Sequence, residues 1–390
     1  MRRTSSSKLI MAASTVAVLG LSACGGSANG AEGKRAGECA LAADNTVVAV
    51  GARSNMKTVS VESLNQYVKP AMAGSKKVTL VDTAGEPKVL ATVDFKSESA
   101  NDQAKADDQS LAASVLTKQL SAEVSSSAEA NPLKALDIAG RELASQGGAG
   151  TIVLVDSGLQ TTGALNYTKG DLLSADPSDI AKSLQAKGQL PDLSNMTVVL
   201  MGVGDTATPQ QPLDTGQQDA LRDQWQAIVE QAGAACVYVD PAPLTGDARA
   251  GAPAVSVVKV PETQAIAPAK KVVLDSSTVP FKTGSAELRE PGATRTKLTQ
   301  IAEQLKASGA KITLTGTTAT DGDSAYQKSL SEQRAQTVKG VLVDLGVSAQ
   351  NITTLGVGIE NPEHVKDVDS EGHLIPELAA KNRTVVLRVQ

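Results

Sequence analysis

LSEQRA at residues 330–335 opens the segment that decides the fold of the C-terminal third of this chain. Apolar side chains continue from it at spacings of three and four, which is the periodicity of one helix face: Val338, Leu342 and Leu345. Residues 292–307 carry a second helical pattern, and residues 312–316 form a short apolar run between the two. The order of these segments predicts alternating strands and helices.

Four further sequences accompany LSEQRA in a fixed order: VPF at 279–281, GSAEL at 284–288, GVGIENP at 356–362 and NRTV at 382–385. The complete set resembles the C-terminal domain family of OmpA. The resemblance implies an α+β domain with the element order βαβαββ over residues 271–390.

The resemblance also implies a ligand, because members of that family bind the diaminopimelate residue of peptidoglycan. In them an aspartate after the second strand pairs with the ligand ammonium, and the arginine of L-S-x-x-R-A binds the carboxylate through two parallel bonds. Arg334 stands at the arginine's place, whereas Ala319 stands where the aspartate belongs. Asp321 or Asp323, a little further along the same turn, would then have to meet the ammonium. The resemblance therefore implies a set of wall-binding residues: Thr318, Asp321, Arg334, Asn382 and Arg383.

Departures from the family pattern indicate a weakened or altered site. An unpaired ligand ammonium at Ala319 costs on the order of 1–3 kcal/mol, which is roughly tenfold to a few hundredfold in affinity. Gln327 occupies a place where the family often has Asn, and Thr384 replaces the second arginine of a terminal N-R-R-V sequence. Arg334 has a second interpretation, as a surface arginine paired with a nearby acid. Residues 359–380 read as a long loop that covers the site or is simply solvated.

The first residues have the layout of a secretory signal peptide. Arg2, Arg3 and Lys8 precede an apolar run at residues 9–21, which is too short to span a membrane. The arginine pair also occurs in twin-arginine signals, but residues 4–7 lack the apolar continuation of those signals. General secretion is therefore favoured.

LSAC at residues 21–24 resembles the lipobox of bacterial lipoproteins, in which the leader is cleaved before the cysteine and the thiol is diacylated. The resemblance implies a leader at residues 1–23, lipid on Cys24 and a tether at residues 24–44. Two or more acyl chains anchor a protein firmly. We therefore expect the chain to be lipid-anchored at the extracytoplasmic face of the cell membrane. Ordinary cleavage after Ala23, which leaves a free thiol, is the alternative.

Export also bears on the two other cysteines, because thiols outside the cytosol tend to pair. Once Cys24 carries lipid, Cys39 and Cys236 are the candidates for a disulfide. Each lies near an apolar run, so the bond would join the two ends of one domain. Two separately buried thiols are the alternative.

Residues 45–243 alternate short apolar runs with helical patterns. Predicted strands cover residues 46–50, 77–82, 89–95, 151–156, 197–203 and 236–239. Predicted helices cover residues 61–72, 110–121, 132–146, 177–187 and 217–232. The strand runs are continuously apolar, which is typical of a mostly parallel sheet with both faces covered.

The element order of this region resembles a von Willebrand factor A domain, a doubly wound α/β fold. Local sequences agree with it: GARSNM at 51–56, AL at 135–136, DSG at 156–158 and MGVG at 201–204. In that family a D-x-S-x-S run after the first strand supplies an acid and two hydroxyls to a divalent cation. Gly51, Arg53 and Asn55 occupy these places. A carboxylate has become hydrogen and a hydroxyl has become a cation, so the oxygen-rich site that Mg²⁺ or Ca²⁺ requires is dismantled and we expect no metal.

Ligands of open α/β sheets bind at the C-terminal ends of the strands. The loops predicted at that edge are residues 51–55, 156–162 and 205–211, which are either a binding surface or ordinary solvated loops. The glycines at 202 and 204 lack the third glycine and the helix start of a dinucleotide-binding sequence. No cofactor is therefore expected.

Net charge and composition limit the classes of binding partner and of chemistry that we expect. The formal net charge is −5, and removal of Arg2, Arg3 and Lys8 with the leader takes it to −8, so nucleic acid is not an expected partner. The two histidines, His364 and His373, lie in the predicted loop and offer little to metal-hydrolase or histidine-dependent chemistry. Residues 244–270 are rich in proline and are predicted to form a connector.

These patterns favour a non-enzymatic lipoprotein of the cell envelope that associates with peptidoglycan through residues 271–390. The main alternative is a receptor or scaffold that binds a protein partner through residues 45–243, with a purely structural C-terminal domain. A hydrolase that uses Asp156 and Ser157 at a strand end is a third hypothesis, although neither residue has a His or Lys beside it in the sequence.

Overall fold

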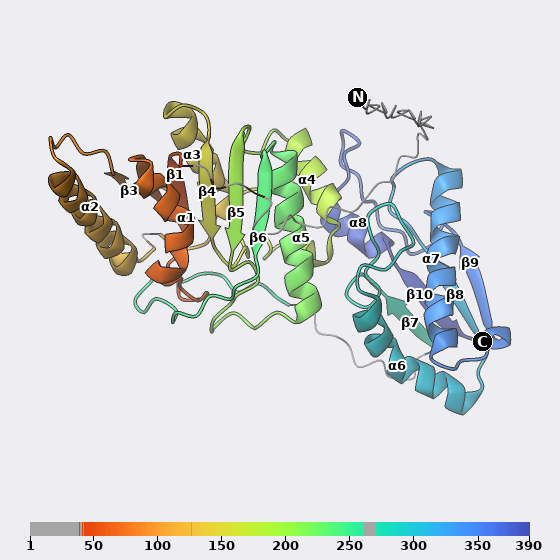
Figure 1. Ribbon diagram of the computed structural model, residues 1–390. Helices are drawn as coiled ribbons and strands as arrows, with labels where there is room; N and C mark the ends of the chain where they lie inside the picture. Colours follow the sequence, from red (N-terminus) through yellow and green to blue (C-terminus); the bar gives the residue numbers. More distant parts are fainter. Residues whose placement is uncertain (1–38, 40, 42, 126, 261–269) are drawn as a thin grey trace, which may run out of the picture. The chain divides into compact units, whose positions relative to one another are not determined.

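The computed structural model describes residues 39, 41, 43–125, 127–260 and 270–390 (Figure 1). The predicted signal peptide, the lipidation site Cys24 and most of the predicted tether lie outside the described residues. Within the described part, none of the helices has both the length and the apolar character needed to cross a membrane. The described strands form two separate sheets, one of six strands and one of four.

The six-stranded sheet is built from the first half of the chain. Its strands are β1 (Thr46–Val50), β2 (Lys77–Asp82), β3 (Val89–Asp94), β4 (Gly150–Val155), β5 (Met196–Met201) and β6 (Cys236–Asp240). They lie in the order β3-β2-β1-β4-β5-β6, and all neighbours are parallel except the antiparallel pair β2 and β3. The carboxyl ends of β1, β4 and β5 therefore meet at one edge.

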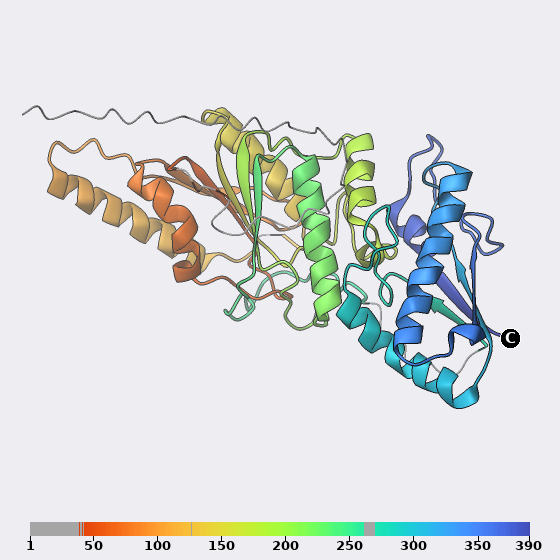
Figure 2. The same ribbon diagram turned by 45° about the vertical axis from the view of Figure 1, so that its right-hand side comes forward.

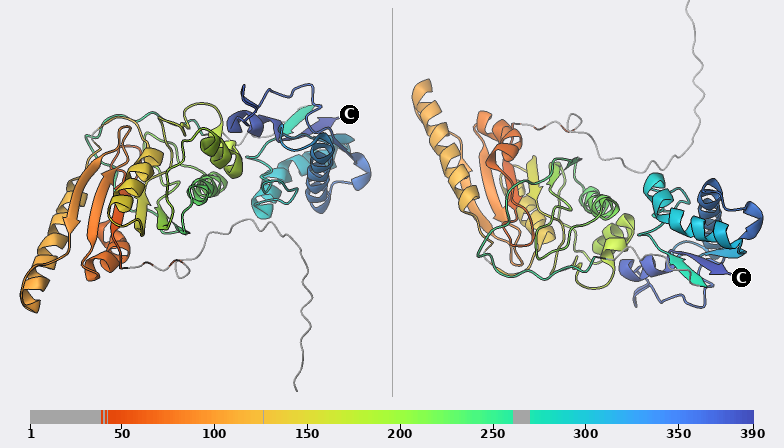
Figure 3. Two further views of the ribbon diagram at one scale, coloured as in Figure 1. Left: turned by 90° about the horizontal axis from the view of Figure 1, so that it is seen from above. Right: turned by 90° about the horizontal axis from the view of Figure 1, so that it is seen from below.

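Helices cover both faces of this sheet (Figure 3). They are α1 (Val61–Ala73), α2 (Asp102–Ala122), α3 (Pro132–Ser145), the short 3₁₀ helix η1 (Leu172–Ser174), α4 (Pro177–Ala186) and α5 (Thr215–Gln231). Successive strand residues point to opposite faces, so Val47 and Ala49 enter the core beneath α3, α4 and α5, whereas Val48 and Val50 enter the core beneath α1 and α2. Burial on both faces explains why the strands are continuously apolar in sequence.

The four-stranded sheet is built from the C-terminal third. Its strands are β7 (Lys271–Leu274), β8 (Ile312–Gly316), β9 (Ile352–Gly356) and β10 (Val385–Val389), in the order β7-β10-β8-β9. The helices are α6 (Pro291–Ser308), α7 (Ser324–Asp344), the 3₁₀ helix η2 (Ala349–Asn351) and α8 (Pro376–Asn382). Leu298 and Ile301 of α6 share one core with Val338 and Leu342 of α7, so both long helices cover the same face of the sheet (Figure 2).

Most predicted elements occur close to their predicted positions, and two differ. Helix α2 begins at Asp102 rather than at residue 110, because its first turns are solvated and show no apolar periodicity. The loop predicted over residues 359–380 was wrong at its end, where α8 begins at Pro376 and buries Ala379 and Ala380. Proline at the first position of a helix costs no hydrogen bond.

Part of the predicted connector packs on the first sheet. Val258 is buried among residues of the six-stranded sheet and its helices. Its backbone N–H donates to Oε1 of Gln210 at 2.8 Å, and its carbonyl accepts from Nε2 of the same residue at 3.0 Å. The limits of the two domains at residues 243 and 271 stay a prediction.

Cys39 and Cys236 form a disulfide, with their Cα atoms 5.8 Å apart. Cys39 precedes β1, which lies inside the sheet, and Cys236 is the first residue of the edge strand β6. The bond therefore ties the beginning of the six-stranded unit to its last strand.

Candidate functional site

Helix α7 holds Arg334 close against the second sheet. Two glycines permit the close approach: a Cβ at Gly316 would lie 1.9 Å from the carbonyl oxygen of Ser331, and one at Gly356 would lie 2.4 Å from the backbone nitrogen of Glu332. The hydroxyl of Ser331 accepts a hydrogen bond from the N–H of Gly358 at 3.0 Å. These contacts fix the first turns of α7 and with them the position of Arg334.

The guanidinium of Arg334 is buried, but only one of its three nitrogens makes a hydrogen bond with the described residues. The side chain is 5% exposed. Its Nε donates to the carbonyl oxygen of Ser285 at 2.9 Å, and its central carbon lies 5.0 Å from the centroid of the Phe281 ring. Among the described residues, no carboxylate lies within ion-pair distance of Arg334, and its two terminal nitrogens make no hydrogen bond. The alternative of a surface arginine paired with a nearby acid does not fit this geometry.

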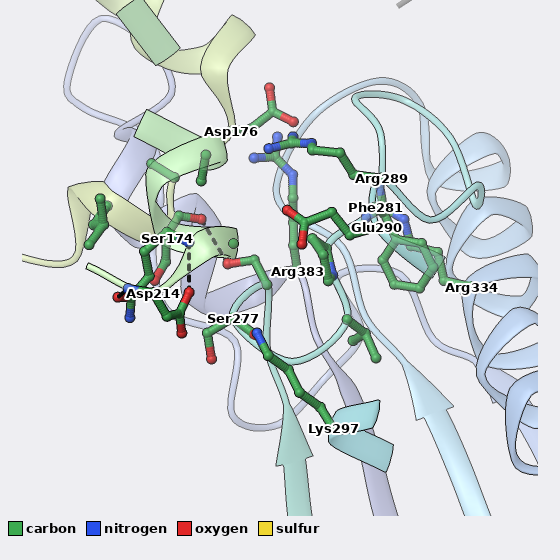
Figure 4. Close-up of a pocket in the computed structure, with 18 residues that line it drawn as sticks. Ser174, Asp176, Asp214, Ser277, Phe281, Arg289, Glu290, Lys297, Arg334 and Arg383 are labelled. Atoms are coloured by element: carbon green, nitrogen blue, oxygen red, sulfur yellow. Dashed lines mark hydrogen bonds between the residues drawn. The ribbon is translucent and has the colours of Figure 1, made fainter. Parts of the chain in front are cut away.

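Arg334 borders a cavity of about 70 Å³ that carries charges of both signs (Figure 4). The cations on its walls are Arg289, Lys297, Arg334 and Arg383. The acids on its walls are Asp176, Asp214 and Glu290. Burial lowers the pKa of Arg334 to about 10, an effect that Arg383 strengthens and the negative charge of Asp176 opposes. The guanidinium therefore remains charged at neutral pH.

Arg383, the second cation of the predicted wall-binding set, is already neutralised. Its Nη1 pairs with the carboxylate of Asp179 in α4, a residue that is 4% exposed. Burial raises the pKa of Asp179, against the effect of Arg383. Of the two predicted arginines in this cavity, Arg334 is the one that has no carboxylate partner among the described residues.

The remaining predicted residues lie outside the walls of this cavity. Asp321 is exposed in the turn after β8. Thr318 is buried, and its backbone N–H donates to the carbonyl oxygen of Gly358 at 3.1 Å. Asn382 is 2% exposed, and its amide holds both the N–H and the carbonyl oxygen of Val365 at 2.9 and 2.8 Å.

Another carboxylate reaches the turn at Ala319. Asp367, from the loop between β9 and α8, is fully buried, and its Oδ2 accepts from the N–H of Thr320 at 3.0 Å and from Nδ2 of Asn382 at 2.8 Å. Nε2 of His364 lies 3.7 Å from its Oδ1. The loop thus contributes an acid next to the position where the family has its aspartate. That acid holds the turn and is closed to solvent.

The strand-end cluster of the first sheet centres on another buried arginine. Arg53 donates from Nη1 to Oδ2 of Asp156 at 2.8 Å and from Nη2 to Oδ1 at 2.9 Å, and both side chains are fully buried. The hydroxyl of Thr83 also donates to Oδ2 of Asp156. Arg53 and Thr83 therefore engage both oxygens of the acid on which the hydrolase hypothesis rests. Ser157, its proposed partner, is fully buried.

Gly51 leaves no room for a metal-binding side chain. A Cβ at this position would lie 2.6 Å from Sδ of Met56 and 2.8 Å from Oδ2 of Asp156. No group of three or more His, Cys, Asp or Glu side chains in the described part of the chain is placed to hold a metal ion. The guanidinium of Arg53 and the hydroxyl of Thr83 occupy the oxygens of Asp156 in this cluster.

Comparison with known proteins places the second sheet in a family. The profile of the OmpA family matches residues 280–371. "Outer membrane protein A" of Bordetella avium is 33% identical over 140 residues, which is 36% of this chain and 67% of that protein. The chain belongs to the OmpA family. The expected mixed α/β chain with an OmpA-like C-terminal domain is thereby confirmed.

Other relatives cover less of their own length. "Peptidoglycan-binding protein ArfA" of Mycobacterium tuberculosis is 37% identical over 93 residues, which is 24% of this chain and 26% of that protein. The chain thus spans about a quarter of the length of that mycobacterial relative. Among solved structures, the peptidoglycan-associated lipoprotein from Burkholderia pseudomallei is 28% identical, with 29% of this chain and 88% of that chain covered and a TM-score of 0.23.

Sequence reasoning did not identify several residues of the cavity in the OmpA-family domain, among them Phe281, Arg289 and Glu290. Phe281 stacks on Arg334, Glu290 borders the same cavity, and Arg289 pairs with Asp223 at 3.3 Å. Glu290 stands directly before Pro291, the first residue of α6, so the proline marks it as a helix-start residue. The carboxylate of Glu290 makes no hydrogen bond or ion pair with the described residues, and burial raises its pKa.

Proposed function

We propose that this chain is a non-enzymatic envelope lipoprotein that associates with peptidoglycan through the cavity around Arg334. The observation that carries the proposal is a buried guanidinium whose two terminal nitrogens make no hydrogen bond with the described residues, on the L-S-x-x-R-A helix of an OmpA-family domain. A buried charge is costly unless a counter-charge meets it. A ligand carboxylate bound by two parallel bonds would remove that cost.

The relatives support the same substrate class. The mycobacterial relative is named a peptidoglycan-binding protein, and the Pseudomonas aeruginosa relative, 41% identical over 69 residues, is named an outer-membrane lipoprotein. The match covers 17% of this chain and 41% of the Pseudomonas protein. For this chain, binding to peptidoglycan is therefore a proposal about residues 271–390.

We infer that lipid on Cys24 anchors the chain to the extracytoplasmic face of the cell membrane. The LSAC sequence and the preceding leader support this, and the Cys39–Cys236 disulfide fits a chain that folds outside the cytosol. Replacement of Cys24 by Ser is expected to release the protein from the membrane fraction and to abolish labelling with a palmitate analogue. Unchanged membrane retention and labelling would contradict the anchor.

We also propose that residues 45–243 form a von Willebrand factor A-like domain without a metal site. The strand order β3-β2-β1-β4-β5-β6 and the two covered faces support this. The Arg53–Asp156 pair takes the place of a bound cation in this proposal.

Sedimentation with purified peptidoglycan tests the binding function. Arg334→Lys keeps the charge but not the two parallel bonds, so it is expected to weaken retention about tenfold or more, as is Arg334→Ala. Arg141→Ala removes an arginine from the exposed surface of α3 and serves as the matched control. Equal retention of all three variants, or no retention of the unaltered protein, would overturn the proposal.

A further inference from the structure

The cavity around Arg334 has two walls that come from different parts of the chain. The OmpA-family domain contributes Phe281, Glu290, Arg334 and Arg383. The other wall comes from η1, the start of α4 and the start of α5, which all belong to the six-stranded unit. Asp176, the residue that caps α4, stands on this second wall.

Polar contacts hold the two walls together. Asp179 pairs with Arg383, and the hydroxyl of Thr283 donates to the two carboxylate oxygens of Asp176 at 3.0 and 2.9 Å. The hydroxyl of Ser276 donates to the carbonyl oxygen of Ser174 at 2.8 Å. The six-stranded unit therefore places Asp176 and Asp214 on the wall of the cavity around Arg334.

The distribution of charge argues against a wall that simply blocks the site. Asp179 neutralises Arg383 and Asp223 neutralises Arg289, but no carboxylate from the described part of the chain pairs with Arg334. Had the first unit acted as a substitute ligand, one of its acids would be expected on Arg334, which is 5% exposed. Asp176 instead bonds a hydroxyl and remains on the cavity wall, where its charge reaches Arg334.

We propose that Asp176 supplies the acid that the OmpA-family domain lacks at Ala319, so that the two domains form one site for a zwitterion. The ligand class is the end group of an α-amino acid: its carboxylate lies on Arg334 and its ammonium on Asp176. The cavity of about 70 Å³ suits such an end group. This inference rests on the proposed peptidoglycan association, and it makes that association a property of the whole chain.

Asp176→Asn removes the charge and keeps a side-chain oxygen that can cap α4. Asn caps helices as well as Asp does, so the bond from the N–H of Ser178 to Oδ1 at 2.9 Å has an equivalent acceptor in the variant. Asp192→Asn is the matched control, because this exposed residue makes the same bond to the N–H of Ser194 at 3.1 Å and does not border the cavity. Circular dichroism spectra that superimpose would show that both variants keep the fold.

Calorimetric titration of the mature chain with meso-diaminopimelate is the deciding measurement. We expect Asp176→Asn to weaken binding about ten- to a hundredfold, the range for one lost charge-assisted bond, and Asp192→Asn to leave it unchanged. Weaker binding by Glu290→Gln together with unchanged binding by Asp176→Asn would overturn the inference, since the acid would then come from the OmpA-family domain itself. Tighter binding by Asp176→Asn would also overturn it, by showing that the wall blocks the site.

The same titration separates the two proposals. If Arg334→Lys weakens binding and Asp176→Asn does not, the result supports the proposed function and contradicts a contribution of Asp176 to the site. If the unaltered chain binds neither meso-diaminopimelate nor peptidoglycan, both fall.

Discussion

Arg53 and Asp156 form a two-bond ion pair, at 2.8 and 2.9 Å, in which both side chains are fully buried. Removal of one partner leaves an uncompensated buried charge, which costs about 3–5 kcal/mol. We expect Arg53→Ala to lower the free energy of unfolding by that amount in urea titrations. Arg141→Ala, which breaks an exposed pair with Asp137, is the control, and its effect should stay below about 0.5 kcal/mol. Similar effects for both variants would show that Asp156 does not depend on Arg53.

The Arg53–Asp156 pair also predicts that divalent cations do not change the stability of the folded chain. A guanidinium already faces Asp156, and a side chain at position 51 would collide with that acid. Addition of Mg²⁺ or of a chelator is therefore expected to shift the unfolding temperature by less than about 1 °C, because no cation binds the folded state selectively. A rise in the unfolding temperature that increases with Mg²⁺ concentration would contradict this.

The Cys39–Cys236 disulfide closes a loop with a sequence separation of 197. Loss of such a bond typically costs about 2–5 kcal/mol, mainly because the unfolded chain gains freedom. We expect the Cys39→Ser, Cys236→Ser double variant to unfold at a lower urea concentration than the unaltered protein. A reductant should lower the midpoint of the unaltered protein and leave that of the double variant unchanged; an equal response of both would count against the bond.

The raised pKa of Glu123 predicts that the free energy of unfolding decreases as the pH rises toward neutral. Burial, together with the negative charge of Asp82, raises its pKa from 4.5 to about 7. The folded chain thus holds this proton more tightly than the unfolded chain, so its contribution to stability is full below about pH 4.5 and is lost as the pH rises through about 7. Glu123→Gln should remove this dependence, on the order of 1 kcal/mol after allowance for partial exposure. Urea midpoints of both proteins at about pH 5 and about pH 8 measure it. If the urea midpoints of the unaltered protein and of Glu123→Gln changed equally between the two pH values, Glu123 would not be the group responsible.

The strands were predictable because burial on both faces leaves a direct signal in the sequence. Thr46–Val50 and Lys77–Asp82 have the predicted bounds, and α3 begins at Pro132 as predicted. The first turns of α2 and the whole of α8 were not predictable from periodicity, because one is solvated and the other has only seven residues.

The candidate site was predictable only in part. LSEQRA identified Arg334, since its family pattern is local, but the partners of the site come from distant segments. Asp179 lies 204 positions from Arg383, and Asp367 lies 47 positions from Thr320, so no local spacing indicates either contact. Loss of oxygen ligands at positions 51 and 53 was visible in the sequence, whereas the pairing of Arg53 with Asp156 was not.

The disulfide also bears on mechanical load. In a chain fixed to a membrane at one end and to the cell wall at the other, as proposed, tension enters the first sheet just ahead of β1. Because Cys39 is bonded to Cys236, that tension passes directly into β6 as well, and β1 cannot be peeled from its neighbours by a pull from the N-terminal side alone. Reduction of this one bond would turn a load shared by two strands into one that acts on a single strand.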